Sequence, residues 1–600
     1  MKQYILFGAG EYARKTLDIV GKNNVDFIVD NNIDKIGKSL DGIIIYSVDK
    51  LIMNSANKIV IIAVSSQFQD EIKAQLEQMQ IQNYKFLGEV KKDILLKKLK
   101  EKTDYIGIYN KAIAWIYNNS IEGKGIICTS NKRKPYPEVT GYFIPTLIRW
   151  GHKTLAISYA KWLCQIQKED GSWYDTDNKN PYIFDTAQIL KGLMAIRNIY
   201  PLVDKNIIKG CNWLLSNMED SGRLVTPTKE EWGKEGVCSE LIHLYCLSPL
   251  IEAGKILNNT SYVEKAIHIL SYYKSNFYDE IINFSILSHF YAYIMEGLLD
   301  VGEIGIVELA MEKIALLQKE SGAVPAYCNV DWVCSTGLFQ FALVWFRLGK
   351  IEEGDKAFKY ACKLQNESGG WYGSYLSEEN GNEENTYFPN SEISWAIKYF
   401  LDALYYRNIS IFNKNADMFL NYIDKEDGRY KVIEELIVKE KKEQGQMLNV
   451  LDIGCGKGRY LNNLISIENH YYGVDLSENV LNKIDNPLII TKQGSLTDIP
   501  FSDNKFDIVY TCEALEHSID IKGSIREMAR VTKSNGKIVI IDKNKELLGC
   551  LEIEEWEQWF IDYELKKILE EFCSTVSVFT ISQDKNEEMN LFITWIGTVK

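Results

Sequence analysis

Several features that would assign this 600-residue chain to a particular class of protein are missing from it. It has no run of about 18 apolar residues, so no membrane span is expected. Its twelve cysteines form no CxxC pair and no Cys/His zinc spacing, which predicts free thiols in a reducing compartment. A net charge of −14 without a basic stripe argues against a nucleic-acid partner. The N-terminal MKQYILFGAGEY has too short an apolar run for a signal peptide, so we expect a cytoplasmic protein.

The composition that remains is that of a globular protein with several domains. The chain is 46% hydrophobic and 25% charged, and its length exceeds what one hydrophobic core supports. We expect an α/β Rossmann-like domain at 1–95, an all-α domain at 104–410, a helical linker at 411–445 and a second α/β domain at 446–600.

The first 95 residues alternate short apolar strands with helical patterns, as in YILFGAG, VDFIVDNN and KIVIIAVSS, which favours a parallel sheet. The turn ILFGAGEYARK resembles the nucleotide-sugar-binding domains attached to sugar acetyltransferases of bacterial glycan synthesis. This resemblance implies a nucleotide site with Gly8 and Gly10 in the turn and Asp30 at the end of the next strand. A scaffold domain without a ligand is the alternative.

A helical repeat with a period of about 50 residues fills residues 104–410. Turns that follow a helix carry Gly123, Gly171, Gly222, Gly322 and Gly369, at spacings of 48, 51, 100 and 47, so one copy lacks its glycine. Each turn precedes a second, more apolar helix, and these begin near Glu138, Asp185, Cys238, Leu287, Cys334 and Asn390. Six hairpins whose apolar helices face inward predict an (α/α)6 toroid, with an open helical solenoid as the alternative.

The repeat resembles two groups of proteins. The turns QKEDGSW and QNESGGW resemble those of terpene cyclases and prenyltransferases, but no DxDD or DDxxD cluster is present. The six-hairpin count is similar to that of glycoside hydrolases, polysaccharide lyases and sugar epimerases. We therefore expect a carbohydrate site built from aromatic residues and inner-helix acids, with helix capping and turn packing as the alternative roles. The candidate residues are Glu138, Tyr142, Trp173, Asp185, Glu240, His243, His289, Trp332, Trp371 and Glu392.

From Gln446 onward strands alternate with helices again, and the last two strands are expected to form an antiparallel hairpin at the sheet edge. The first strand leads into LDIGCGKGRY, with an acid followed by three glycines at alternate positions. This spacing differs from the G-x-G-x-x-G dinucleotide pattern, although glycine still lets a ligand approach the backbone. Asp475 ends the second strand, where a carboxylate can accept hydrogen bonds from ribose hydroxyls.

Four linked motifs resemble class I S-adenosylmethionine-dependent methyltransferases in order and spacing: VLDIGCGKGRYL, GVDLS, GSLTDIPFSDNKFDIVYTCEALEH and REMARVTKSNGKIVI. The resemblance covers Asn449–Ile541 and the closing hairpin, and it implies S-adenosylmethionine as cofactor. Ser495 stands where the family often has an acid for the adenine. The implied cofactor contacts are Asp452, Gly454, Cys455, Gly456, Gly458, Asp475, Leu476, Ser495, Leu496 and Cys512. A degenerate domain that binds no cofactor is the alternative.

The segment CEALEH follows the fourth strand of this region. It places Glu513, Glu516 and His517 on one face if a helix begins there. Histidine is the natural base for an acceptor hydroxyl, and carboxylates favour hard cations such as Mg²⁺. The segment resembles the E-x-x-E-H of ubiquinone-pathway and small-RNA 2′-O-methyltransferases, where it is associated with a metal. We therefore regard these three residues as candidate catalytic residues and metal ligands, with a helix cap as the alternative.

These regions together predict a methyltransferase that O-methylates a sugar, either nucleotide-linked or part of a surface glycan, while the toroid recognises or processes the glycan. Three alternatives remain. The first is a small-metabolite methyltransferase with a scaffold toroid. The second is a bifunctional enzyme whose toroid is a glycoside hydrolase, lyase or epimerase. The third is a glycan-binding protein whose methyltransferase domain is silent.

Overall fold

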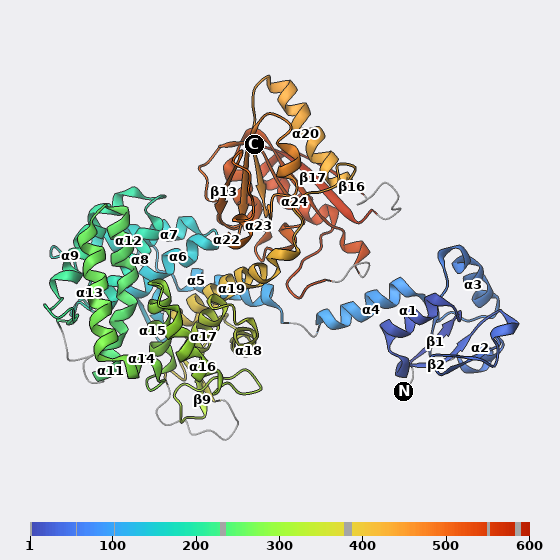
Figure 1. Cartoon of the computed structure of the whole chain (residues 1–600), viewed down its shortest axis with the longest axis horizontal. Helices are drawn as coiled ribbons and strands as arrows, with labels where there is room; N and C mark the ends of the chain where they lie inside the picture. The colour runs from blue at the N-terminus through green and yellow to red at the C-terminus, as the bar shows by residue number, and fades with distance from the viewer. Residues whose placement is uncertain are drawn as a thin grey trace. The chain divides into compact units, whose positions relative to one another are not determined.

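The computed structural model describes residues 3–55, 57–100, 103–227, 236–376, 387–548, 553–581 and 590–600 (Figure 1). Residue contacts divide the chain into two units. The first comprises residues 1–103 together with 544–561, and the second comprises residues 104–543 together with 562–600. The helical repeat and the C-terminal sheet therefore belong to one unit. Among the described residues, no helix is long and apolar enough to cross a membrane. The eleven cysteines in the described part of the chain are in no disulfide with one another.

The first unit contains a six-stranded sheet in the order β3-β4-β2-β1-β5-β6. All its neighbouring strands pair in parallel except β3 with β4. Its elements alternate between strand and helix, as the sequence predicted. Their bounds are β1 Tyr4–Phe7, α1 Glu11–Val20, β2 Val25–Val29, β3 Ser39–Leu40, β4 Ile43–Tyr46, α2 Lys50–Asn54, β5 Ile59–Ile62, α3 Ser66–Gln78, β6 Tyr84–Phe86 and α4 Leu87–Lys100.

The turn after β1 is held by backbone contacts of the sheet. Gly8 has φ +113°, and a Cβ there would lie 2.7 Å from the Ala63 carbonyl oxygen, so only glycine fits. Asp30 follows β2 and accepts a hydrogen bond from the Ala9 N–H at 2.7 Å, while no atom lies within 4 Å of a Cβ built on Gly10. The predicted nucleotide residues therefore lie together at the carboxyl ends of the inner strands β1 and β2. Their binding role stays a prediction.

The second unit begins with the helical region, defined here as residues 105–415. Six helices have one face exposed, and the helical segments that alternate with them are almost entirely buried. The exposed set is α5 Tyr105–Asn119, α7 Lys153–Ile166, α9 Asp204–Ser216, α13 Thr260–Asn276, α16 Ile304–Ala315 and α18 Ile351–Cys362. The buried set is α6 Pro137–Arg149, α8 Ile183–Ile196, η5 Ile242–Cys246 with α12 Leu247–Ile256, α15 Ser288–Asp300, α17 Ser335–Arg347 and α19 Ser394–Asn415. The predicted starts of the apolar helices agree with the observed starts to within four residues, and at the third the helical segment begins with α11 Gly236–Leu241, before η5.

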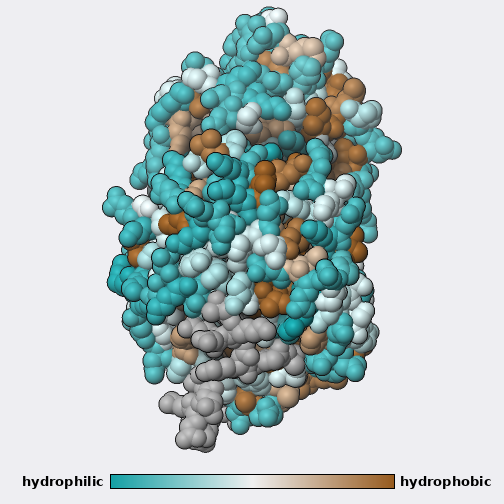
Figure 2. All heavy atoms as spheres, turned by 90° about the vertical axis from the view of Figure 1, so that its left-hand side faces the viewer, coloured by the Kyte–Doolittle hydropathy of each residue, from teal (hydrophilic) through white to brown (hydrophobic). Residues whose placement is uncertain are grey.

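The buried helices contact one another in a regular succession. Helix α6 contacts α8, α8 contacts η5 and α12, these contact α15, α15 contacts α17, α17 contacts α19, and α19 contacts α6 again. Hydrogen bonds join the same two ends, because Trp115 of α5 donates to the Glu392 carboxylate at 2.7 Å. The outer face of this region is largely hydrophilic, with hydrophobic side chains in small separate groups (Figure 2).

The repeated glycines occupy positions where the turn meets a neighbouring helix. A Cβ on Gly171 would lie 2.3 Å from the Lys209 carbonyl oxygen of α9, and one on Gly369 would lie 2.2 Å from the Lys111 carbonyl oxygen of α5. Both glycines also have positive φ, so a side chain is excluded on two grounds. The glycine repeat in the sequence thus marks where each turn packs against another exposed helix.

The C-terminal part of the second unit is a seven-stranded sheet in the order β13-β12-β11-β14-β15-β17-β16. The five strands β11–β15 pair in parallel, and β17 pairs antiparallel with both β15 and β16, which confirms the predicted terminal hairpin. Helix α20 Gly428–Gln444 precedes the sheet. The other bounds are β11 Asn449–Ile453, α21 Leu461–Leu464, β12 His470–Asp475, α22 Glu478–Leu481, β13 Ile489–Gln493, β14 Phe506–Cys512, α23 Ile521–Val531, β15 Thr532–Lys543, α24 Asp562–Phe572, β16 Cys573–Ile581 and β17 Phe592–Val599.

Candidate active site

The glycine loop after β11 forms an open cradle at the carboxyl end of the sheet. Gly454, Gly456 and Gly458 have φ of +75°, +53° and +76°. A Cβ on Gly454 would lie 2.3 Å from the Ala514 Cβ, whereas no atom lies within 4 Å of a Cβ on Gly456. The loop therefore needs glycine to turn at its first position and leaves space beside the backbone at its second.

Asp452 lies at the end of β11, beneath this loop. It is almost completely buried, and the Tyr510 hydroxyl of the neighbouring strand β14 interacts with its carboxyl group. Burial raises the pKa of its carboxyl group to about 7. A carboxyl group can accept more hydrogen bonds than Tyr510 supplies, so its position beside an open glycine loop fits a ligand with a hydrogen-bond donor.

Asp475 lies at the end of the neighbouring strand β12. Its Oδ2 accepts a hydrogen bond from the Gly456 N–H at 2.9 Å, and its Oδ1 accepts one from the Ser477 N–H at 2.9 Å. Each carboxylate oxygen can accept a second hydrogen bond, so this anchored side chain keeps capacity for ligand hydroxyls. Leu476 follows directly, and its carbonyl accepts a hydrogen bond from the Gln493 side chain at 3.1 Å.

The loop after β13 contains Ser495 and Leu496 and lies against the helical region. The Ser495 hydroxyl is 3.1 Å from the Thr497 hydroxyl, and Thr497 donates to the Arg149 carbonyl at the end of α6, at 2.7 Å. Lys153 of α7 forms ion pairs with Asp498 and Glu527 at 3.0 and 2.8 Å. The loop that the resemblance assigns to adenine is therefore held by the helical region.

Two cysteines complete the predicted cofactor set. Cys455 is buried behind the glycine loop, with its Sγ 2.8 Å from where Gly473 would carry a Cβ. The Cys512 Sγ lies 3.0 Å from the Tyr460 hydroxyl at the end of β14. Both thiols pack within the domain, and burial raises the pKa of each, so neither is a reactive thiolate.

Glu513, directly after β14, is held by two arginines. Its Oε1 is 2.9 Å from Arg459 Nη2 of the glycine loop and also pairs with Arg429 of α20, which in turn pairs with Asp427. Burial acts to raise the pKa of Glu513, but the two guanidinium groups outweigh it and lower the pKa below its usual value. Glu513 is therefore ionised and serves to tie helix α20 to the glycine loop.

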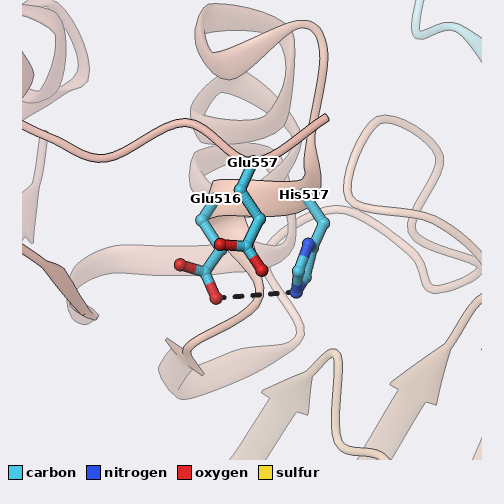
Figure 3. A group of neighbouring side chains, drawn as sticks. All are labelled: Glu516, His517 and Glu557. Atoms are coloured by element: carbon cyan, nitrogen blue, oxygen red, sulfur yellow. Dashed lines mark ion pairs between the residues drawn. The ribbon is translucent and has the colours of Figure 1, made fainter. Parts of the chain in front are cut away.

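His517 and Glu516 form a second pair in the same segment (Figure 3). His517 Nε2 lies 3.5 Å from Glu516 Oε1, which also accepts a hydrogen bond from Lys543 at 2.9 Å. Burial, and next the Lys543 charge, lower the pKa of His517 to about 3, so its imidazole is neutral at physiological pH. Phe412, near the end of α19, meets the imidazole edge to face at 5.3 Å between ring centroids.

The expectation of one helical face in this segment is wrong. Only Leu515–His517 are helical, as a 3₁₀ turn, and Glu513 has φ +54° because it turns away to reach the arginines. Glu513 faces two arginines while Glu516 and His517 face each other, so the three do not form one face, and metal binding by this segment stays a prediction. Positive side chains already compensate both carboxylates, so these contacts give no support to a Mg²⁺ site made by the three.

In the helical region the structure brings some predicted residues together. Glu138 and Asp185 lie at the starts of the adjacent helices α6 and α8, and Tyr142 of α6 meets Tyr399 of α19 at 6.4 Å between ring centroids. His289 Nδ1 donates a hydrogen bond to Gln340 Oε1 at 2.7 Å, and its ring stacks on Trp395 at 6.1 Å between centroids. These buried groups come from five helices of the succession, α6, α8, α15, α17 and α19.

The other predicted residues of this region have structural partners. Trp173 and Trp371 are fully buried and donate to the Leu163 and Ala361 carbonyls, at 2.7 and 2.8 Å, so they lock the turns as the alternative role proposed. The remaining four contact nearby side chains. Glu240 binds Arg223, His243 lies 2.9 Å from the Tyr273 hydroxyl, Glu392 accepts from Trp115 and Asn366, and Trp332 packs on Tyr327.

Sequence reasoning missed Arg429, Arg459 and Phe412. Arg459 lies within the glycine motif, so its charge beside Glu513 was visible in principle. The other two lie 84 and 105 positions before their partners Glu513 and His517, and no local spacing connects them. Only the packing of α19 and α20 on the sheet brings them there.

Comparison with known proteins relates the C-terminal region to methyltransferases. Residues 451–540 match the family described as "Methyltransferase domain", and residues 1–87 match the family described as "C2185-like, N-terminal". The chain is 30% identical over 168 residues to a chloroplastic tocopherol O-methyltransferase of Arabidopsis thaliana, covering 25% of this chain and 47% of that protein. It is 31% identical over 145 residues to a demethylmenaquinone methyltransferase of Listeria welshimeri, covering 22% and 59%. It thus spans about half the length of the curated relatives it matches.

Solved structures of methyltransferases are also similar. An S-adenosylmethionine-dependent methyltransferase of Mesorhizobium loti is 15% identical, covering 28% of this chain and 98% of that one, with a TM-score of 0.24. A Haemonchus contortus phosphoethanolamine N-methyltransferase in complex with S-adenosylmethionine is 18% identical, covering 33% and 59%, with a TM-score of 0.25.

The C-terminal part of the chain carries a class I methyltransferase domain. S-adenosylmethionine is the cofactor of this family, and the open glycine loop, the buried Asp452 and the anchored Asp475 fit it.

Proposed function

We propose that this protein is an S-adenosylmethionine-dependent methyltransferase. The observation that carries the proposal is the open glycine loop, with the buried Asp452 carboxyl group beneath it and the anchored Asp475 beside it. Bound there, the cofactor supplies an electrophilic methyl group on its sulfonium. Asp475, held by two backbone N–H groups, is placed to accept hydrogen bonds from the ribose hydroxyls.

The residues of the chain contribute mainly alignment. Methyl transfer needs the acceptor atom in line with the methyl group, and holding two reactants in place supplies much of the rate. Neutral His517 can accept a hydrogen bond from an acceptor hydroxyl. Because its pKa is about 3, it binds a proton weakly, which favours orienting the hydroxyl over full deprotonation.

We propose further that the helical region is an (α/α)6 toroid. Two observations support this. The contacts of the buried helices return from α19 to α6, and the last turn glycine, Gly369, packs on the first exposed helix, α5. Six hairpins that meet end to end bury every repeat without exposed end repeats.

A role of this toroid in methyl transfer is supported by the contacts of helix α19. Helix α19 is about 33 Å long at 1.5 Å per residue, and its two ends contact different parts of the unit. Trp395 near its start lies among the buried aromatic rings, whereas Phe412 and Asn413 near its end contact His517 and the Ser477 hydroxyl, the latter at 2.6 Å. Helix α6 reaches the loop of Thr497 in the same way. This arrangement supports a toroid that recognises the acceptor.

The acceptor that we propose is a hydroxyl group of a sugar, nucleotide-linked or within a surface glycan. The buried aromatic rings of the toroid and its buried carboxyl groups, whose pKa values are raised, support a carbohydrate. A second candidate is the hydroxyl of a quinol-like small molecule, which is favoured by the named acceptors of the curated relatives.

The test uses S-adenosylmethionine labelled in its methyl group. The purified protein is incubated with nucleotide sugars, lipid-linked glycans and prenylated quinols in separate reactions. Label in a sugar fraction supports the first candidate, and label in quinols supports the second. A Gly454→Val variant is the matched control, because its side chain would collide with Ala514 and abolish cofactor binding. If wild-type protein does not bind the cofactor in equilibrium dialysis, the proposal of methyl transfer is wrong.

A further inference from the structure

The last turn of helix α19 reaches the strand end that carries Asp475. The Ser477 hydroxyl donates a hydrogen bond to Asn413 Oδ1 at 2.6 Å. Ser477 is fully buried, and its backbone N–H donates to Asp475 Oδ1 at 2.9 Å. Helix α19 also contacts α22, which begins directly after Ser477. Two hydrogen bonds through one residue thus connect a side chain of the helical region to the candidate ribose carboxylate.

Ser477 is the central group of this short chain of hydrogen bonds. Its hydroxyl oxygen also accepts a hydrogen bond from the Val480 N–H at 3.1 Å and so caps helix α22. A hydroxyl has one proton to donate, and in Ser477 that proton goes to Asn413. The amide oxygen of Asn413 therefore fixes the orientation of the hydroxyl. Because the N–H that holds Asp475 belongs to the same residue, a shift of Ser477 moves the carboxylate.

The chain that follows α19 continues this attachment toward the glycine loop. The connecting segment, defined here as residues 416–427, leads from α19 to α20. Three of its backbone carbonyls accept hydrogen bonds from side chains of the methyltransferase domain. Lys457 of the glycine loop donates to the Asp417 carbonyl at 3.1 Å, and Asn462 and Asn463 of α21 donate to the Asn421 and Ile423 carbonyls at 2.9 and 2.7 Å. The glycine loop and α21 are therefore attached to the end of α19 as well.

The connecting segment also forms an ion pair, between Asp417 and Lys483, just beyond α22. The Asp417 carboxylate is 94% exposed, and pairs at the surface contribute little free energy. The contact of Asn413 is different because its partner, the Ser477 hydroxyl, is withdrawn from water. A buried hydroxyl that loses its acceptor costs more than an exposed ion pair that opens.

We propose that Asn413 is a positioning residue for the cofactor, acting through Ser477 on the Asp475 carboxylate. Asn413 orients a group that binds ribose, so its effect is on cofactor affinity. The helical region thereby takes part in binding the cofactor, in addition to recognising the acceptor. This inference rests on the proposed function, because it requires that Asp475 bind the ribose hydroxyls.

The test is isothermal titration of the full-length protein with S-adenosylhomocysteine, the demethylated cofactor. Asn413→Leu has a similar volume but no acceptor for the Ser477 proton, so the affinity should fall about tenfold, as for one lost hydrogen bond. Asn413→Asp keeps the acceptor oxygen and should retain most of the affinity. Asn415→Leu is the matched control in the same turn of α19, at a side chain without a hydrogen bond to a described residue. It should not change the affinity.

A cofactor analogue separates the positioning of Asp475 from general support of the fold. The 2′,3′-dideoxy analogue of S-adenosylhomocysteine lacks the hydroxyls that Asp475 is placed to bind. Wild type and Asn413→Leu should bind this analogue equally, because the variant loses contacts that the analogue cannot make. An equal loss of affinity for both compounds would show that Asn413 supports the whole site, and it would overturn the positioning role.

Failure of this inference and failure of the proposed function give different results. If wild type and Asn413→Leu bind S-adenosylhomocysteine equally well, the positioning role is wrong and the methyltransferase proposal stands. If the wild-type protein does not bind S-adenosylhomocysteine, both are wrong.

Discussion

Buried acids of the helical region and of the methyltransferase site have pKa values that are shifted in opposite directions. Glu138 and Asp185 face each other with raised pKa values, while Glu513 has a lowered pKa between Arg429 and Arg459. All three are carboxyl groups withdrawn from water, and desolvation alone raises the pKa of each. The difference lies in the partners, because two guanidinium groups outweigh the desolvation of Glu513.

This difference separates Glu513, which is ionised and held by arginines, from Glu138 and Asp185, whose pKa values are raised. Ionised Glu513 has its hydrogen-bonding capacity occupied by arginines and serves to hold the site together. The pair on α6 and α8 has no arginine partner and receives only the Tyr136 hydroxyl among the described residues, so burial decides its pKa values. Lys398, the nearest cation, pairs with Asp402. The charge state of a buried acid therefore depends on its partners and not on its burial alone.

The largest effect is expected from removing an arginine. Arg429→Met leaves Arg459 as the one arginine paired with Glu513. It also removes the guanidinium group that pairs with Asp427. We expect the free energy of unfolding at pH 7 to fall by about 3 kcal/mol, as for other broken buried pairs. Urea denaturation measures it. Lys431→Met, at an exposed pair with Glu426, is the control and should have little effect. An unchanged stability of Arg429→Met would contradict the account of Glu513.

The next effect concerns the pH dependence of stability. Asp185 has a folded-state pKa of about 7 against an ordinary 3.8, so between these values the folded state binds more protons. Stability should therefore fall as pH rises from about 4 to about 7. Asp185→Asn removes this loss and should stabilise the protein at pH 8 by about 2–4 kcal/mol, at 1.36 kcal/mol per pKa unit.

The control for this experiment is Asp402, whose pKa is shifted in the opposite direction. The pKa of Asp402 is lowered, because Lys398 and Arg149 outweigh its burial. Asp402→Asn should therefore destabilise the protein at pH 8, as measured by the same urea titrations at pH 5 and pH 8. Equal slopes with pH for wild type and Asp185→Asn would refute the neutral-acid interpretation.

A smaller effect is expected at His517. His517→Ala should lower the methyl transfer rate by about 10- to 100-fold, at the low end of acid–base effects because the imidazole mainly orients the acceptor. Since its pKa is about 3, the wild-type rate should not fall through an acid limb near pH 6.5. A pH–rate profile from pH 5.5 to 8 tests this, and an unchanged rate in the variant would remove His517 from the mechanism.

The smallest effect is expected at the contact between the helical region and the site. Phe412→Leu removes the edge-to-face contact with His517, and we expect a loss of a few-fold in kcat with little change in S-adenosylmethionine affinity. Phe388→Leu, at an exposed ring in the same region, is the matched control. A change in cofactor affinity alone would show that Phe412 supports the loop and not the imidazole.

Much of the architecture follows from local patterns. The 50-residue glycine repeat identified the turns, since positive φ and close backbone contact at Gly171 and Gly369 exclude a side chain. The glycine loop and the acids at the ends of β11 and β12 were likewise visible in order and spacing. The predicted helical face at Glu513 failed, because a long-range ion pair with Arg429 outweighs the local preference for a helical turn.

The amino-acid sequence by itself determined the periods, the turns and the methyltransferase motifs, because these depend on residues within a few positions of one another. Only the tertiary structure decided which acids are charged. Arg429 reaches Glu513 across 84 positions, and Tyr136 reaches Asp185 across 49. Protonation depends on desolvation and on the nearest opposite charge, and both exist only after α6, α8, α19 and α20 have packed.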